Sequence, residues 1–293
     1  MKRQRKLSIN LVSLAILIVI VAFAGCAAKK NLWGDTETGL ILQYRMAKDQ
    51  PLKYAAEFEL TQILDIMGQE MEQVQDKSYT FTITSKSVEN NTHQLEVVVD
   101  NMVASSASPQ GDLKADMSTV IGKSFAMALS LLGKEQNMQE AEAIKYKIGP
   151  AERSIISDFQ AIFPDLAGSP VKVGETWTTQ DTIIEKADDM EIRIKLTSVN
   201  TLSGYETLSG MECAKITAEV TGVFEGEGNQ GGMDLVFDVD IKADDTWYFA
   251  YKEGIVVQTV SIGDGKGTLE TSGPQNMSIP VVIETKSGIK LVK

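Results

Sequence analysis

The sequence predicts a mainly β fold of antiparallel strands with one central amphipathic helix. Charged and apolar residues alternate with a period of two in segments 190–197 and 234–241, which is typical of strands with one buried and one solvated face. Segments 79–84 and 95–99 show the same alternation. Neighbouring strands are too close in sequence for helical crossovers, so we expect antiparallel pairing. Two arrangements remain open, a half-barrel and two β halves.

Turn-forming residues mark the expected hairpins. Residues 88–92 contain Asn90-Asn91 between two predicted strands, which favours a hairpin. Further turns are expected at 202–204, 252–254 and 272–274. The alternating glycines of segment 263–267 also predict a turn, because the segment lacks the length and the following helix of a phosphate-binding loop.

The one predicted helix covers residues 151–163. Pro150 suits its first turn and Pro164 ends it. Five apolar residues recur at helical spacing, namely Ile155, Ile156, Phe159, Ile162 and Phe163. We expect this stripe to pack against the sheet. Segment 117–132 fits both periods, and we expect a helical turn followed by a strand.

The N-terminal 26 residues combine a basic start, an apolar run and a cysteine. Residues 11–24 form an apolar stretch of 14 residues, shorter than a helix needs to span the hydrocarbon core. Ala24-Gly25 leads directly into Cys26. This segment resembles the signal and lipobox of a bacterial lipoprotein, although Phe23 stands where such signals usually carry leucine. The alternative is an uncleaved N-terminal anchor.

The lipoprotein resemblance implies that Cys26 carries diacylglycerol and becomes the mature N-terminus. Two acyl chains hold a protein stably on a bilayer, so the membrane is an expected partner. Ala27 follows the cysteine, where an aspartate retains many lipoproteins at the inner membrane. We therefore expect a lipid-anchored cell-envelope protein, on the periplasmic side of the outer membrane if the organism is didermal.

Five segments follow from these assignments. They are a signal peptide (1–25), a lipidated cysteine with its tether (26–38), a first β half (39–148), the helix with a Pro/Gly turn segment (149–174), and a second β half (175–293).

Composition excludes some partners and sets the source of stability. Removal of the signal leaves 24 basic residues against 40 acidic ones, a formal net charge of −16. Nucleic acid is not an expected partner, because phosphate binding depends on clustered Lys and Arg. With Cys26 lipidated, Cys213 has no disulfide partner, so hydrophobic burial must be the main stabilising term.

Segment 163–177 carries a second resemblance. It contains Phe163-Pro164, the turn Pro170-Val-Lys-Val-Gly174, and Trp177 at the start of a predicted strand. This arrangement resembles the central segment of an uncharacterised family of bacterial envelope proteins, many of them lipoproteins, known only as a domain of unknown function. The resemblance implies a fold layout and says nothing about chemistry. We expect Trp177 to pack against the helix or the sheet.

No residue is assigned to catalysis or to a metal, and no cofactor is expected. His93 is the single histidine, which excludes metal sites built on two or three histidines, and we expect it to be exposed at the end of a loop. Cys213 is expected to be an unreactive thiol. The acidic segment 225–234 lacks the sixth-position glycine and twelfth-position acid of an EF-hand, so we expect a hairpin tip.

The expected function is therefore binding without catalysis, of either an envelope protein or an apolar ligand. Eleven methionines follow the initiator, and this flexible side chain serves both core filling and apolar surfaces of variable shape. A dry cavity between the predicted helix and the sheet would favour an apolar ligand. The alternatives are an envelope hydrolase that uses paired carboxylates and a passive spacer.

Overall fold

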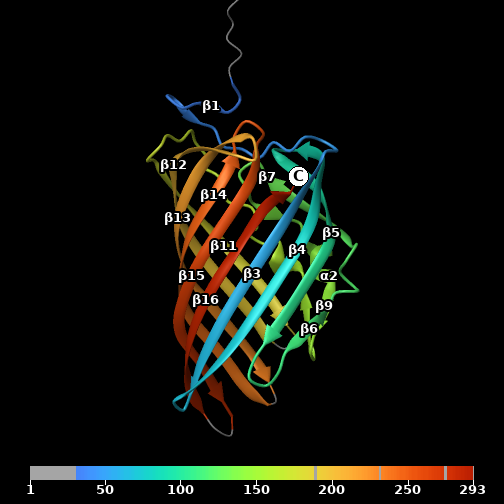
Figure 1. The fold of residues 1–293 in the computed structure, drawn as a ribbon, viewed down its shortest axis with the longest axis vertical. Coiled ribbons are helices and arrows are strands. Elements are labelled where there is room, and N and C mark those ends of the chain that lie inside the picture. The colour runs from blue at the N-terminus through green and yellow to red at the C-terminus, as the bar shows by residue number, and fades with distance from the viewer. Residues whose placement is uncertain (1–30, 188–189, 231, 274–275, 293) are drawn as a thin grey trace, which may run out of the picture.

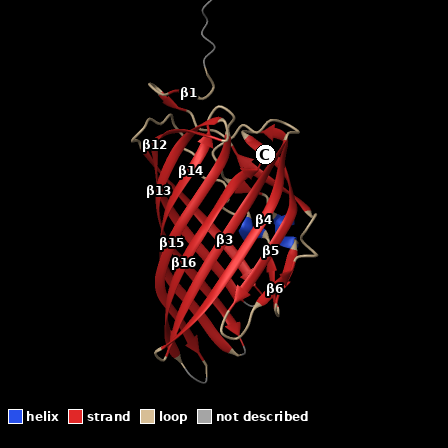
Figure 2. Cartoon of the chain, viewed as in Figure 1, coloured by secondary structure: helices blue, strands red, loops and turns tan. Residues whose placement is uncertain are grey.

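The computed structural model describes residues 31–187, 190–230, 232–273 and 276–292. These residues form one antiparallel sheet of 14 strands and a separate two-stranded ribbon (Figure 1). Helical structure within them is limited to α2 (Gln139–Ala143) and the 3-10 turn η1 (Ile156–Asp158), as Figure 2 shows. The predicted mainly β, antiparallel fold is confirmed.

The strands fall into short and long groups. The short strands are β1 (Gly34–Asp35), β2 (Gly39–Leu40), β6 (Leu113–Asp116), β7 (Ser124–Ser130), β8 (Glu135–Gln136), β9 (Lys145–Ile148) and β10 (Ala151–Ser154). The long strands are β3 (Pro51–Ile66), β4 (Gln69–Glu89), β5 (Thr92–Ala107), β11 (Thr176–Ala187), β12 (Met190–Leu208), β13 (Met211–Gln230), β14 (Met233–Ala250), β15 (Ile255–Ser272) and β16 (Met277–Val292).

Strands from both ends of the chain share the large sheet. Its hydrogen-bonded order is β4-β3-β16-β15-β14-β13-β12-β11-β10-β9-β6-β5-β7-β8, and β4 also pairs with β5. The pairing of β3 with β16 joins the segments on either side of residues 149–174. In contrast, β10 meets β11 at the single pair Arg153↔Ala187. The long strands form a tall curved wall (Figure 1).

The inner face of this wall carries two apolar clusters. The larger cluster lies toward the end of the molecule where β1 lies, the upper end in Figure 1, and it is rich in aromatic contacts. The rings of Phe81 and Phe159 meet edge to face with centroids 5.2 Å apart, and Tyr44 meets Phe163 at 5.8 Å. Because Phe159 and Phe163 come from the segment between the two sets of long strands, that segment fills this half of the interior.

The smaller cluster lies toward the opposite end and is built by the sheet alone. Its buried members are Leu235, Val239, Leu269, Ile279, Val281 and Ile283. Every residue of both clusters lies between Trp33 and Leu291, so this part of the chain carries its own core.

Two of the predicted hairpins have turns in the described residues. Asn90 and Asn91 join β4 to β5 with φ values of 50° and 61°, which are typical of a type I′ turn. Residues 252–254 join β14 to β15 as predicted. The predicted turn at 202–204 is wrong, because the register shift between Leu202 and Gly204 is a bulge inside β12.

The helix predicted at 151–163 is wrong. Ala151–Ser154 forms β10, which pairs with β9, and only Ile156–Asp158 makes one 3-10 turn. Ala161 then adopts a left-handed φ of 57°, which no helix interior allows. The apolar residues at helical spacing are nevertheless buried, since Ile155, Phe159 and Phe163 enter the larger cluster. Contacts with the sheet therefore override local helix propensity.

The described part of the predicted tether is short. Trp33 packs against the larger cluster, and Gly34–Asp35 pairs with Gly39–Leu40. The structure places this ribbon at the upper end in Figure 1, opposite the smaller cluster.

Candidate functional site

Successive strands align apolar side chains across the lower half of the interior. Following the register from β11 through β3, one row contains Ile183, Ile194, Phe224, Val239, Gly267, Val281 and Leu64. The period-two alternation of each strand turns these side chains to the same face. Several members are only half-buried, including Ile194, Phe224 and Leu64. This face is thus apolar without being filled.

A cavity of about 240 Å³ lies along these rows. Apolar residues from β3, β11, β12, β13, β14 and β16 line it, among them Leu60, Ile183, Leu196, Val220, Phe237, Val239 and Ile283. Ligand pockets span roughly 300 to 1,000 Å³, so this space suits a slender apolar chain better than a bulky ring system. It lies away from residues 155–163, whose apolar side chains Ile155, Phe159 and Phe163 pack into the larger cluster.

Glycines within β15 leave room for side chains of the two neighbouring strands. The predicted turn at 263–267 is wrong, because these residues lie inside β15. A Cβ on Gly265 would lie 2.8 Å from both Ile241 Cγ2 and Ile283 Cγ1, closer than carbon atoms approach. The glycine therefore permits a close approach within a strand. A period-two run of glycines in phase with an apolar face is the sequence signal for this role.

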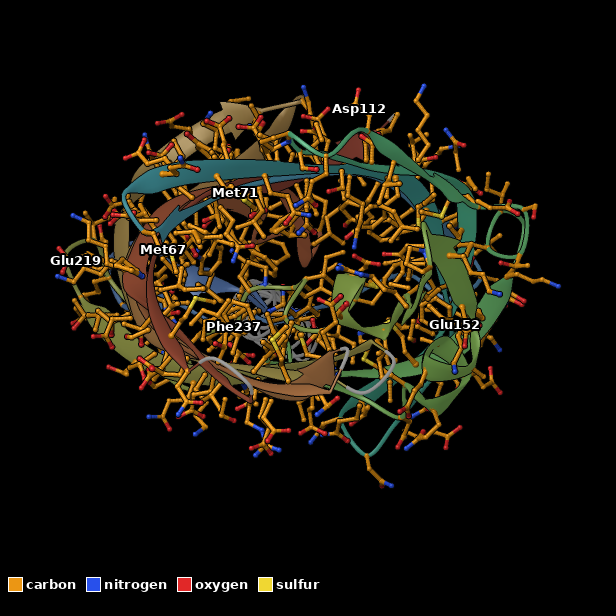
Figure 3. The ribbon with its side chains drawn as sticks, turned by 90° about the horizontal axis from the view of Figure 1, so that it is seen from below. Met67, Met71, Asp112, Glu152, Glu219 and Phe237 are labelled. Carbon is orange, nitrogen blue, oxygen red and sulfur yellow. The ribbon has the colours of Figure 1, made fainter. Side chains whose placement is uncertain are left out.

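Methionines gather beyond the cavity, at the end of the long strands that is remote from β1. Met67 lies in the turn from β3 to β4 and is 84% exposed, and Met233, at the start of β14, is 37% exposed. Met71, Met190 and Met277 are half-buried near the same end of their strands. Figure 3, seen from this end, shows Met71 and Phe237 on the inner side of the wall and Glu219 on its outer side. The flexible thioethers form an adaptable apolar rim.

A row of polar residues closes the inner end of the cavity. Asp245, Ser261 and Ser287 are register partners on β14, β15 and β16, and the row continues through Phe58 to Lys77. We call these five register partners the polar row, although one of them, Phe58, is apolar. Lys77 Nζ lies 2.5 Å from Asp158 Oδ1 on η1, so the segment inside the sheet is held by an ion pair at this level.

The carboxyl group of Asp245 stands apart in the polar row. Burial raises its pKa, Ser261 opposes that shift, and neighbouring Asp244 adds to it. No donor among the described residues reaches its buried Oδ1 atom, and none of the ion pairs among them includes it. The sequence signal for this residue is an acid in phase with the apolar positions 235, 237, 239, 241 and 243, where the alternation of the strand leads to an apolar residue.

His93 is buried, so the prediction that it is exposed at a loop end is wrong. Its side chain is on the inner face of β5, with Nδ1 2.9 Å from Ser85 Oγ and Nε2 3.2 Å from the carbonyl oxygen of Tyr44. Burial lowers its pKa, and Ser85 is also buried. The pair is inaccessible to a substrate, and both ring nitrogens already have partners. His93 is a satisfied core residue.

Cys213 and Trp177 lie in packed surroundings. Cys213 is fully buried, and burial raises the pKa of its thiol to about 11, which disfavours the reactive thiolate as the prediction of an unreactive thiol requires. Trp177 begins β11, donates its indole N–H to the carbonyl of Asp165 at 3.1 Å, and meets Trp247 edge to face at 6.0 Å. The predicted packing role of Trp177 is confirmed.

A second, polar cleft of about 530 Å³ lies between β8, α2 and β11. Burial raises the pKa of Glu135 to about 8, while its Oε1 accepts the Phe163 N–H at 3.0 Å. Asp181 lies in the same cleft but contacts Lys134 Nζ at 2.6 Å, and Lys134 also pairs with Asp165. These groups therefore bridge β8, β11 and the segment after η1.

The predicted lipidation site, Cys26, and the signal peptide lie outside the described residues. Within the residues that are described, no helix is long and apolar enough to cross a membrane, and no group of three or more His, Cys, Asp or Glu residues is placed to hold a metal ion. The chain matches no known protein-family model and no curated protein.

Proposed function

We propose that this chain is a lipid-anchored cell-envelope protein that binds an apolar ligand without catalysing a reaction. The observation that carries the proposal is the cavity of about 240 Å³ lined by inward-facing aliphatic and aromatic residues. Burial of apolar surface stabilises a protein by roughly 25 cal/mol per Å². The half-buried side chains of the apolar row do not contribute this stabilisation in full. A ligand that covers this surface recovers that energy.

The position of the cavity supports a carrier rather than a passive spacer. The described chain begins at the upper end in Figure 1, whereas the methionine rim is at the lower end. A strand rises about 3.3 Å per residue, so β13, with 20 residues, is about 66 Å long. Anchoring through Cys26 would thus hold the rim away from the anchored bilayer, where it could exchange its ligand with an envelope partner.

Filling the cavity is expected to weaken ligand binding. Ala243→Leu adds three carbon atoms to the cavity wall and displaces one or two methylenes of a bound chain. Each lost methylene costs about 0.8 kcal/mol, which is roughly a fourfold loss of affinity. The measurement is photo-crosslinking of the full chain in its native membranes with a twelve-carbon alcohol that carries a diazirine, followed by mass spectrometry of the labelled peptides.

The matched control is Ala55→Leu, which makes the same change on the outward face of β3. Ala55 lies between the buried residues Tyr54 and Ala56, so its side chain points away from the interior. Its labelling should equal that of the wild type. Absence of label on the strands that line the cavity, or equal labelling of all three proteins, would overturn the proposal.

A second candidate function is hydrolysis by paired carboxylates, and Glu135 is the observation that favours it. A carboxyl group whose pKa is about 8 is protonated at neutral pH, as a general acid must be, and Asp181 lies in the same cleft. The ion pair between Asp181 and Lys134 favours a structural role instead. A hydrolase would lose its activity on a glycosidic substrate in Glu135→Gln and keep its alkyl labelling.

Glu135→Gln is also expected to flatten the dependence of stability on pH. The folded-state pKa of about 8 lies above the usual glutamate value of about 4.3, so the folded state retains a proton that the unfolded state releases. Wild-type stability therefore falls as the pH rises through this interval, and the variant should lose about 3 to 4 kcal/mol less between pH 5 and 8. Urea unfolding at both pH values measures the difference.

The control for this prediction is Glu142→Gln. Glu142 lines the same cleft but is exposed, so its variant should follow the wild-type pH dependence. A Glu135→Gln curve parallel to the wild type would show that the Glu135 carboxyl is ionised in the folded protein.

A further inference from the structure

The inner end of the cavity differs chemically from its walls. Asp245 continues the inward-facing series of β14 beyond Ile241 and Ala243, and it lines the cavity with Ser261 and Ser287. All three side chains are half-buried. The cavity thus presents one carboxyl and two hydroxyl groups at one end, and mainly aliphatic and aromatic side chains along the rest. The other polar residues that line it are Gln62, Lys242, Asp264 and Thr285. This arrangement matches an amphiphile, with an apolar tail and one polar head.

The carboxyl group at this end has Ser261 as a hydrogen-bond partner, but none of the ion pairs among the described residues neutralises its charge. Oδ1 of Asp245 is buried, and no donor among the described residues reaches it. The one cation in the polar row is Lys77, which is bound to Asp158 at 2.5 Å. It lies four strands from Asp245 along the sheet, about 19 Å at 4.8 Å per strand. An unpaired buried carboxyl group costs free energy unless a donor satisfies it.

The chemistry of the head group follows from this unpaired carboxyl group. A carboxylate or phosphate head would place like charges together in a poorly solvated space, which is unfavourable. A protonated amine both donates hydrogen bonds and neutralises the charge, and charge-assisted hydrogen bonds are about twice as strong as neutral ones. A hydroxyl head can donate one hydrogen bond but leaves the charge in place.

We infer that the cavity takes a single apolar chain that ends in a protonated amine, with the amine against Asp245 and the tail directed toward the methionine rim. The inference rests on the proposed function and names its ligand class. Ser261 and Ser287, as register neighbours of Asp245 along the polar row, supply acceptors for the remaining N–H groups of the amine.

The test uses the full chain in its native membranes and three twelve-carbon probes with a diazirine at the tail. Their head groups are a primary amine, a hydroxyl and a carboxylate. For each probe, labelling of Asp245→Asn is divided by labelling of the wild type, which removes the probe's own partition into the bilayer. The amine ratio should fall about tenfold or more, the size expected for a lost charge-assisted hydrogen bond, while the hydroxyl ratio should change less than threefold.

The matched control is Asp244→Asn, which removes the neighbouring carboxylate on the outward, exposed side of the same strand. All three of its ratios should stay near one. In the wild type, the tail diazirine should label peptides at the rim end of β12, β14 and β16. Retained hydroxyl labelling in Asp245→Asn shows that the variant is folded and that its cavity still accepts a tail.

The outcomes separate this inference from the proposed function. Equal amine ratios for Asp245→Asn and Asp244→Asn, with label still on the cavity strands, would overturn the head-group assignment alone. Label on the inner end instead of the rim would overturn the orientation. Failure of all three probes to label the cavity strands of the wild type would overturn the proposed function itself.

Discussion

Replacing Cys26 by serine is expected to leave the chain with residues 1–25 and without acyl groups. The resemblance to lipoprotein signals implies that diacylglyceryl transfer to the thiol precedes cleavage, and a hydroxyl group is a far weaker nucleophile than a thiolate. The intact mass of the wild type should therefore correspond to a chain that starts at Cys26 and carries lipid. Metabolic incorporation of an alkyne fatty acid measures the same difference, and it should disappear completely in Cys26→Ser.

Cys213→Ser is the matched control for Cys26→Ser, because these are the only two cysteines of the chain. Cys213 is fully buried, so no acyl transfer can reach it in the folded protein, and fatty-acid incorporation should be unchanged. A wild-type mass that includes residues 1–25 without added lipid would contradict the proposed anchor and favour an uncleaved N-terminal anchor. Incorporation that persists in Cys26→Ser would place the lipid elsewhere.

The strands and one hairpin turn can be predicted from the sequence, because alternation and turn-forming residues are local signals. The alternation in segments 190–197 and 234–241 appears in the structure as β12 and β14, because an antiparallel strand with one wet face must alternate. Asn90-Asn91 predicted its hairpin for an equally local reason, since asparagine tolerates the positive φ of a type I′ turn. Both signals depend only on residues near in sequence.

The predicted helix failed because its pattern reflected tertiary contacts. Ile155, Phe159 and Phe163 are buried, as the helical spacing required, but an irregular chain puts them in the core. Pairing of β10 with β9 takes the place of helical hydrogen bonds at 151–154, and the left-handed φ of Ala161 is incompatible with a helix. Burial alone does not distinguish a helix from a loop that enters a core.

The candidate site depended on register, which one strand cannot reveal. The alternation of segment 234–241 predicts one apolar face, but nothing within this strand gives Asp245, in the same phase, a role. Its meaning depends on Ser261 and Ser287, which the antiparallel register brings alongside it. His93 likewise gained its burial from Ser85 and Tyr44, which lie 8 and 49 positions away. Such neighbours follow from the topology of the sheet.

Replacing Lys77 by methionine is expected to destabilise the protein by about 3 to 5 kcal/mol, the usual cost of removing one partner from a buried ion pair. The side chains of Lys77 and Asp158 are only 15% and 7% exposed. Burial raises the pKa of Asp158, and Lys77 opposes that shift. Without the lysine, the carboxyl group must take up a proton or remain buried and uncompensated. The free energy of unfolding in urea measures the loss.

A surface ion pair provides the comparison for Lys77→Met. Lys286 and Glu59 lie 3.1 Å apart with side chains 65% and 46% exposed, and solvent screens such pairs, so Lys286→Met should cost less than about 1 kcal/mol. Adding Asp158→Asn to Lys77→Met removes the uncompensated charge and should restore most of the lost stability. Similar losses in Lys77→Met and Lys286→Met would show that the pair is solvated.

The dependence on pH distinguishes lost charge compensation from lost packing. In Lys77→Met the folded-state pKa of Asp158 rises further above the unfolded value of about 3.9, since Lys77 no longer opposes the effect of burial. The folded state binds a proton that the unfolded state releases, so the stability of the variant falls as the pH rises through this interval and partly recovers in acid. Lys77→Met with Asp158→Asn lacks this carboxyl group and should not show that recovery.

The ion pair between Lys77 and Asp158 joins β4 to η1. Loss of this ion pair would also loosen the polar row at the inner end of the cavity. Alkyl labelling of Lys77→Met should then extend to peptides of the segment 155–163.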